Sequence, residues 1–126
     1  MSEKIAFIGL GAMGGPMASN IIKKGNKVSI FDIDSNKLKK VSDIGGTPAK
    51  SIEEVISKAE IVITMLPATK EVLGVMLGEN GLVNILKPGS IIMDMSTIAP
   101  HGTDEVAKNC FKNNIHFIDA PVGRLV

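Results

Sequence analysis

The chain has 126 residues, with 14 Lys and Arg against 13 Asp and Glu, so its formal net charge is +1. This length fits one domain, and the balanced charge gives no reason to expect nucleic acid or an anionic membrane as a partner. Hydrophobic residues make up 44%, which is enough for a buried core and excludes a disordered tail. The single cysteine, Cys110, cannot form an internal disulfide, so we expect a reducing, cytoplasmic setting.

One uncharged stretch, residues 5–22, is long enough to be considered as a membrane span. Its four glycines and Pro16 argue against a helix in lipid. The preceding Glu3-Lys4 pair is also a poor basic leader for a signal peptide. We therefore expect a soluble protein with no membrane partner.

Short apolar runs alternate with helix-like stretches along the chain. Gly25-Asn26 is typical of a helix end, and Ser51 precedes Glu54 by the spacing of a helix-starting capping box. Pro67 ends the most apolar run, and Pro100 suits the first turn of a helix. The pattern predicts strands at residues 5–8, 28–31, 48–49, 61–66, 90–95 and 116–120, and helices at 13–24, 35–44, 51–59, 69–77, 82–86 and 100–113.

This alternation of strands and helices predicts an α/β fold. Because the strands are continuous apolar runs, we expect a doubly wound parallel sheet that is covered on both faces. Right-handed crossovers then place a ligand crevice at the carboxyl ends of the first and fourth strands.

The segment Gly9-Leu10-Gly11-Ala12-Met13-Gly14 matches the pattern G-x-G-x-x-G and stands between a predicted strand and a predicted helix. In that context the first glycine permits a tight turn, and the second lets the backbone approach a pyrophosphate. The third lets helix and strand pack closely, while the helix N-terminus supplies partial positive charge. The alternative is a glycine turn with a purely structural role. We favour a Rossmann-type dinucleotide-binding domain.

Asp32 follows the second predicted strand, 18 residues after Gly14. An acid at this place accepts hydrogen bonds from the adenosine ribose hydroxyls. Its carboxylate repels a 2′-phosphate, so NAD is favoured over NADP, although Lys37 leaves some room for NADP. The alternative is that Asp32 caps the next helix, a role that Asp34 could fill instead.

Two further segments follow predicted strands at the same edge. Met65-Leu66-Pro67 ends the fourth strand and Ser96-Thr97 follows the fifth, which places both beside the expected cofactor. The alternatives are strand core for the first segment and helix capping for the second. His101 and His116 lack a third ligand at metal spacing, so we expect no metal site, and Cys110 is expected in the core.

Four motifs in order make the chain resemble the β-hydroxyacid dehydrogenases. They are residues 9–18, Met65-Leu66-Pro67, Met95-Ser96-Thr97 and Asp119-Ala120-Pro121-Val122. The resemblance implies NAD(P)-linked interconversion of a small anionic hydroxyacid and its aldehyde. It also implies which residues line the dinucleotide, namely Gly9, Leu10, Gly11, Ala12, Met13, Gly14, Asp32, Met65, Leu66, Pro67 and Thr97.

The chain departs from the family after Val122, where most members have Ser-Gly-Gly. The pair Gly123-Arg124 in that place resembles the sulfolactaldehyde-reducing members, in which the arginine binds the sulfonate. The implied substrate contacts are therefore Ser96, Gly123 and Arg124. The alternatives are a 3-hydroxyisobutyrate or tartronate semialdehyde enzyme, and for Arg124 simple exposure near a terminus.

The resemblance places the catalytic lysine in a helical second domain, which also builds the dimer. Residues 1–126 are therefore expected to form the N-terminal dinucleotide-binding domain of a homo-oligomeric enzyme, with no catalytic residue in this chain. The alternative from another class is a nucleotide-sensing regulatory domain. The motifs Met65-Leu66-Pro67 and Met95-Ser96-Thr97 argue against it.

Overall fold

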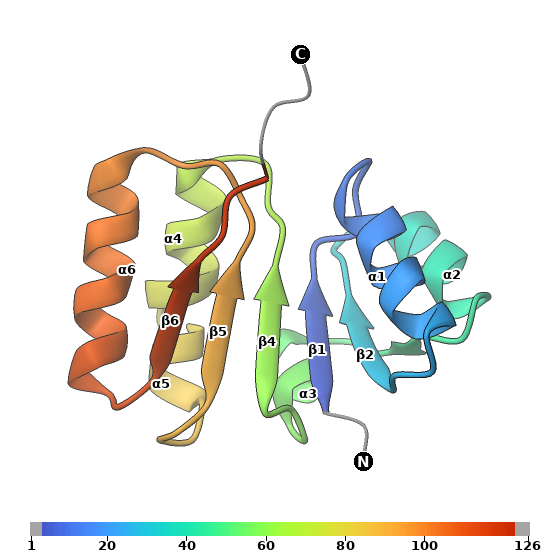
Figure 1. Ribbon diagram of the computed structural model, residues 1–126, viewed down its shortest axis with the longest axis horizontal. Coiled ribbons are helices and arrows are strands. Elements are labelled where there is room, and N and C mark those ends of the chain that lie inside the picture. Colours follow the sequence, from blue (N-terminus) through green and yellow to red (C-terminus); the bar gives the residue numbers. More distant parts are fainter. Residues whose placement is uncertain (1–3, 123–126) are drawn as a thin grey trace.

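The computed structural model describes residues 4–122, which form a parallel sheet between two layers of helices (Figure 1). The strand order is β3-β2-β1-β4-β5-β6, and every neighbouring pair is parallel. This order confirms the predicted doubly wound Rossmann-type α/β fold, whose strand order reverses between β1 and β4. The strands are β1 (Ile5–Ile8), β2 (Val28–Phe31), β3 (Thr47–Pro48), β4 (Ile61–Thr64), β5 (Ile91–Asp94) and β6 (His116–Asp119).

Two hydrophobic clusters hold the helices to the two faces of the sheet. Along β1, Ala6 and Ile8 point into one cluster and Phe7 into the other, because successive strand side chains alternate between faces. The Phe7 face packs against α1 (Gly14–Lys23) and α2 (Ser35–Ser42). The opposite face packs against α3 (Ile52–Ile56), α4 (Thr69–Leu77), α5 (Leu82–Ile85) and α6 (Pro100–Lys112).

Several elements are shorter than the sequence predicts, for local reasons. The third helix ends at Ile56, because the Ser57 hydroxyl donates to the Glu54 carbonyl and competes with the helical pattern. The fourth strand ends at Thr64, since the Leu66 amide donates to a side chain, the Ser96 hydroxyl, instead of to a neighbouring strand. In residues 4–122 no helix combines the length and the apolar character needed to cross a bilayer.

Polar side chains fix where two helices begin. Asp34 caps α2, and one of its oxygens accepts from the amides of Asn36 (2.9 Å) and Lys37 (3.3 Å). This settles the alternative for Asp32, which is not the cap. At α3 the Ser51 hydroxyl accepts from the Glu54 amide at 3.1 Å, as predicted, whereas the Glu54 carboxylate reaches back to the amide of Lys50.

Candidate functional site

The carboxyl ends of β1, β2, β4 and β5 lie along one edge of the sheet, the upper edge in Figure 1. The predicted dinucleotide residues leave the sheet at this edge, so the fold brings together segments that are far apart in sequence. Residues 9–14, here called the glycine loop, follow β1 and Asp32 follows β2. Residues 65–67 follow β4, and residues 96–97 follow β5. Gly123 and Arg124 lie outside the described residues.

The three glycines of the glycine loop meet different surroundings. Gly9 has φ +100°, and a side chain there would overlap the Met65 carbonyl oxygen of the neighbouring strand end. A side chain on Gly14 would overlap the Gly9 carbonyl oxygen, so α1 can approach the loop only with glycine at its start. At Gly11, by contrast, a side chain would meet no atom within 4 Å. The first and third glycines thus serve packing, whereas space stays open beside the second, as a pyrophosphate requires.

Helix α1 begins at Gly14, the last residue of the glycine loop. Met13 occupies the N-cap position, and no side chain among residues 4–122 makes a capping hydrogen bond to the helix. The first turn carries no acidic residue. The Gly15 amide donates to the Gly11 carbonyl and Pro16 has no N–H, so the Gly14 amide is the donor that the first turn leaves available. This amide and the helix dipole favour an anionic group at this point, next to the open space at Gly11.

Asp32 ties the glycine loop to the end of β2. One carboxylate oxygen accepts from the Leu10 amide at 2.7 Å, and the other accepts from the Asp34 amide at 2.8 Å. Each carboxylate oxygen can accept more than one hydrogen bond, so this half-buried side chain keeps acceptor capacity for a ligand hydroxyl. Sequence reasoning identified the residue but missed its bond to the loop.

A buried network joins the ends of β4 and β5. One oxygen of Asp94 accepts from the Thr64 hydroxyl at 2.8 Å and from the Ser96 amide at 3.1 Å. The Ser96 hydroxyl in turn accepts from the Leu66 amide at 2.7 Å. Ser96 is fully buried, so its hydroxyl is committed within the protein, whereas Thr97 beside it is exposed. Sequence reasoning missed Thr64 and Asp94, although an acid at the end of an apolar strand was a usable signal.

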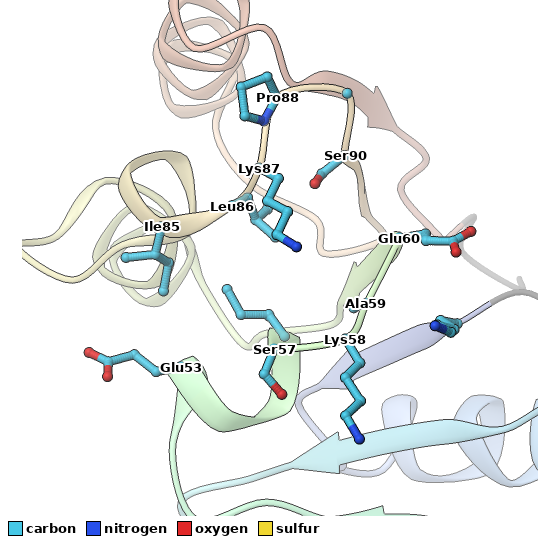
Figure 2. A pocket seen from close by; sticks show the side chains of 13 residues that line it. Glu53, Ser57, Lys58, Ala59, Glu60, Ile85, Leu86, Lys87, Pro88 and Ser90 are labelled. Atoms are coloured by element: carbon cyan, nitrogen blue, oxygen red, sulfur yellow. The ribbon is translucent and has the colours of Figure 1, made fainter.

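A hollow of about 740 Å³ lies at the opposite edge, near the amino ends of the strands (Figure 2). Its rim carries exposed charges of both signs, among them Lys58, Lys87, Glu53 and Glu60. Open sheets of this class bind ligands outside the carboxyl ends of their strands. The hollow lies at the amino ends of the strands, so it is not the site where we expect the dinucleotide, although its volume is large.

The remaining reactive side chains are placed as follows. Cys110 is buried in the core as predicted, and burial raises the pKa of its thiol from 9.0 to about 11. This keeps the residue in the unreactive thiol form at neutral pH. Within residues 4–122, no group of three His, Cys, Asp or Glu side chains is arranged to hold a metal ion.

Comparison with known proteins supplies a family. The family described as the NAD binding domain of 6-phosphogluconate dehydrogenase matches residues 4–124. The chain is 41% identical over 120 residues to 3-sulfolactaldehyde reductase of Escherichia coli, a match covering 95% of this chain and 40% of that protein. It is 36% identical over 120 residues to NAD-dependent L-serine dehydrogenase of Pseudomonas aeruginosa, with the same two coverages.

A solved structure agrees with these relatives. Mycobacterium tuberculosis 3-hydroxyisobutyrate dehydrogenase with L-serine superposes with a TM-score of 0.90 at 31% identity, over 98% of this chain and 42% of that one. The chain thus spans about two fifths of the length of the proteins it matches. It belongs to the β-hydroxyacid dehydrogenase family, whose NAD-binding domain it represents.

Proposed function

We propose that this chain is the N-terminal, cofactor-holding domain of an NAD-dependent oxidoreductase that interconverts a small hydroxyacid and its aldehyde. The observation that carries the proposal is the open space at Gly11, set between the uncapped start of α1 and Asp32. A dinucleotide needs room, donors for its phosphates and an acceptor for its ribose, and this edge offers all three.

The residues fit the cofactor in two groups. The amides of residues 11–14, at the end of the glycine loop and the start of α1, would bind the pyrophosphate, and Asp32 would accept from the adenosine ribose. Exposed or half-buried residues at the ends of β4 and β5 would flank the other mononucleotide. A bound nicotinamide supplies or accepts the hydride. The proposed lining is Gly9, Leu10, Gly11, Ala12, Met13, Gly14, Asp32, Met65, Leu66, Pro67 and Thr97.

NAD is the proposed cofactor, in preference to NADP. The Asp32 carboxylate gains hydrogen bonds from two ribose hydroxyls but repels a 2′-phosphate. Lys37, exposed in the first turn of α2, is a nearby cation that would offset this repulsion in part. Its backbone amide already donates to Asp34, so only the side chain is available.

For the substrate we propose a small aldehyde acid or the hydroxyacid that corresponds to it, with 3-sulfolactaldehyde ahead of tartronate semialdehyde, 3-hydroxyisobutyrate and L-serine. The support is the pair Gly123-Arg124 and the identity to the Escherichia coli reductase. A guanidinium offers a rigid fork of donors that suits the three oxygens of a sulfonate. The Ser96 hydroxyl already accepts a hydrogen bond from the Leu66 amide, so Ser96 would contribute to the substrate site by holding the loop after β5 in position.

The test begins with the chain itself. NADH should bind in a fluorescence titration, whereas no hydroxyacid should turn over, because we place the general acid in a second domain outside this chain. Failure to bind NADH would remove the proposal, and tighter binding of AMP or ATP than of NADH would favour the nucleotide-sensing alternative. In an enzyme extended by a second domain, Arg124→Ser should lower kcat/KM for sulfolactaldehyde far more than for carboxylate semialdehydes. Equal losses would discard the sulfonate assignment.

A further inference from the structure

Asp94 is an unusual residue for its position. It closes the apolar strand β5 opposite Thr64 of β4, and its side chain is completely buried. One of its carboxylate oxygens, Oδ2, has no hydrogen-bond partner within residues 4–122. Burying a carboxylate with an unpaired oxygen opposes folding, so packing alone does not explain an acid here.

The other oxygen, Oδ1, is the start of a chain of contacts that leads toward the crevice. It accepts from the amide of Ser96, which fixes the turn after β5. The Ser96 hydroxyl then accepts from the amide of Leu66, which fixes the segment after β4. That segment lies against the glycine loop, since Gly9 has no space for a side chain beside Met65 and Leu66.

We propose that Asp94 is a positioning residue for the nicotinamide half of the cofactor site. Through Ser96 it holds residues 65–67 and 96–97 as one rigid wall of the crevice. The inference rests on the proposed function, and on the division of a Rossmann-type sheet into two mononucleotide-binding halves. The glycine loop and Asp32 serve the adenosine half, and the ends of β4 and β5 are left for the nicotinamide half.

Rigidity in this wall matters because a site that is already ordered loses less conformational freedom when the ligand binds. Without the Asp94 oxygen, the Ser96 amide loses its acceptor and the Ser96 hydroxyl can rotate away from Leu66. Ordering that segment would then oppose binding of the nicotinamide half. The adenosine half is held by a separate hydrogen bond, from the Leu10 amide to the Asp32 carboxylate, so its affinity for a ligand should stay the same.

The experiment compares two probes on the same chain: NADH, and ADP-ribose, which keeps the adenosine and both phosphates but lacks nicotinamide. Asp94→Ala should weaken NADH binding about tenfold, the effect of losing one or two aligned hydrogen bonds, and leave ADP-ribose within about twofold. Asp94→Asn keeps an acceptor oxygen in place and should restore NADH binding to within about threefold. Ser96→Ala removes only the acceptor for the Leu66 amide and should also weaken NADH binding but not ADP-ribose binding. This variant provides the test if Asp94→Ala does not fold.

Val106→Ala is the matched control, because it opens a cavity in the core under α6 and lowers stability without touching the network. It should change the affinity for neither probe. Equal losses of NADH and ADP-ribose in Asp94→Ala and Ser96→Ala would overturn the inference, as would unchanged binding of both. If the unmutated chain binds neither probe, the proposed function itself fails, which is a distinguishable result.

Discussion

Gly11→Ala should separate folding from cofactor binding. A methyl group at Gly11 meets no protein atom within 4 Å, and the residue does not adopt a left-handed backbone. Replacing glycine by alanine at such a position restricts the unfolded chain and changes stability by about 0.4–1 kcal/mol in the favourable direction. The fold should therefore tolerate the substitution.

Cofactor binding should respond in the opposite direction. The space beside Gly11 is where the backbone is expected to approach the pyrophosphate, and a methyl group would fill it. Overpacking of a close contact typically costs about 1–3 kcal/mol, which corresponds to an NADH affinity roughly 5- to 150-fold weaker.

Gly14→Ala provides the contrast on the same loop. Its methyl group would overlap the Gly9 carbonyl oxygen, which is backbone and cannot move aside cheaply. We expect a loss of about 3 kcal/mol or more of unfolding free energy.

Urea unfolding followed by circular dichroism measures stability, and fluorescence titration measures NADH affinity in each folded variant. The reasoning is refuted if Gly11→Ala folds and binds NADH as tightly as the unmutated chain. It is also refuted if Gly11→Ala destabilises the chain as much as Gly14→Ala.

Three further changes test other parts of the structure. Asp32→Ser should reduce the preference for NADH over NADPH by about 1–3 kcal/mol, and equal affinities in the unmutated chain would contradict the role of Asp32. Ser51→Ala should lower the unfolding free energy by about 1 kcal/mol in urea melts, because α3 loses its cap; no change would mean that Glu54 and Lys50 suffice. Because burial raises the pKa of Cys110 from 9.0 to about 11, the unfolding free energy does not depend on the ionisation of this thiol below about pH 9 and should fall by roughly 1–3 kcal/mol as the pH rises toward 11, where the unfolded chain loses the proton first. Urea melts across this range should show the decline in the unmutated chain and a smaller one in Cys110→Ala.

The sheet could be predicted because its signals are local. Most of the four-residue strands are apolar runs, and several are followed closely by a residue that favours a turn, such as Gly9 after β1 and Pro67 after β4. The boundaries were less predictable where a side chain replaces a backbone partner. Leu66 is apolar and extends the apolar run of β4, yet its amide is bound by the Ser96 hydroxyl, 30 positions further along the chain. No local pattern contains that information.

The same distinction applies to the candidate site. The glycine loop and Asp32 follow a known spacing, so sequence reasoning could name them and predict their common edge. The same spacing assigns a different role to each glycine. The structure agrees with that assignment, because a side chain would overlap backbone at Gly9 and Gly14 but would meet no atom within 4 Å at Gly11. Sequence reasoning passed over Asp94. An acid at the end of an apolar strand draws attention to the position, but its burial and its bond from the Thr64 hydroxyl are seen only once the neighbouring strand is in place.

Asp32 and Asp94 have related positions in the two halves of the sheet. Asp32 follows the second strand and accepts from the Leu10 amide, and Asp94 ends the fifth and accepts from the Ser96 amide. Each carboxylate thereby fixes a loop at the same edge, but Asp32 is half-buried and Asp94 is fully buried. A ligand hydroxyl can reach only the first, so the role proposed for Asp32 combines contact with positioning, while the role proposed for Asp94 is exerted through other residues alone. Removing Asp32 should therefore weaken NADH and ADP-ribose together, whereas removing Asp94 should weaken NADH only.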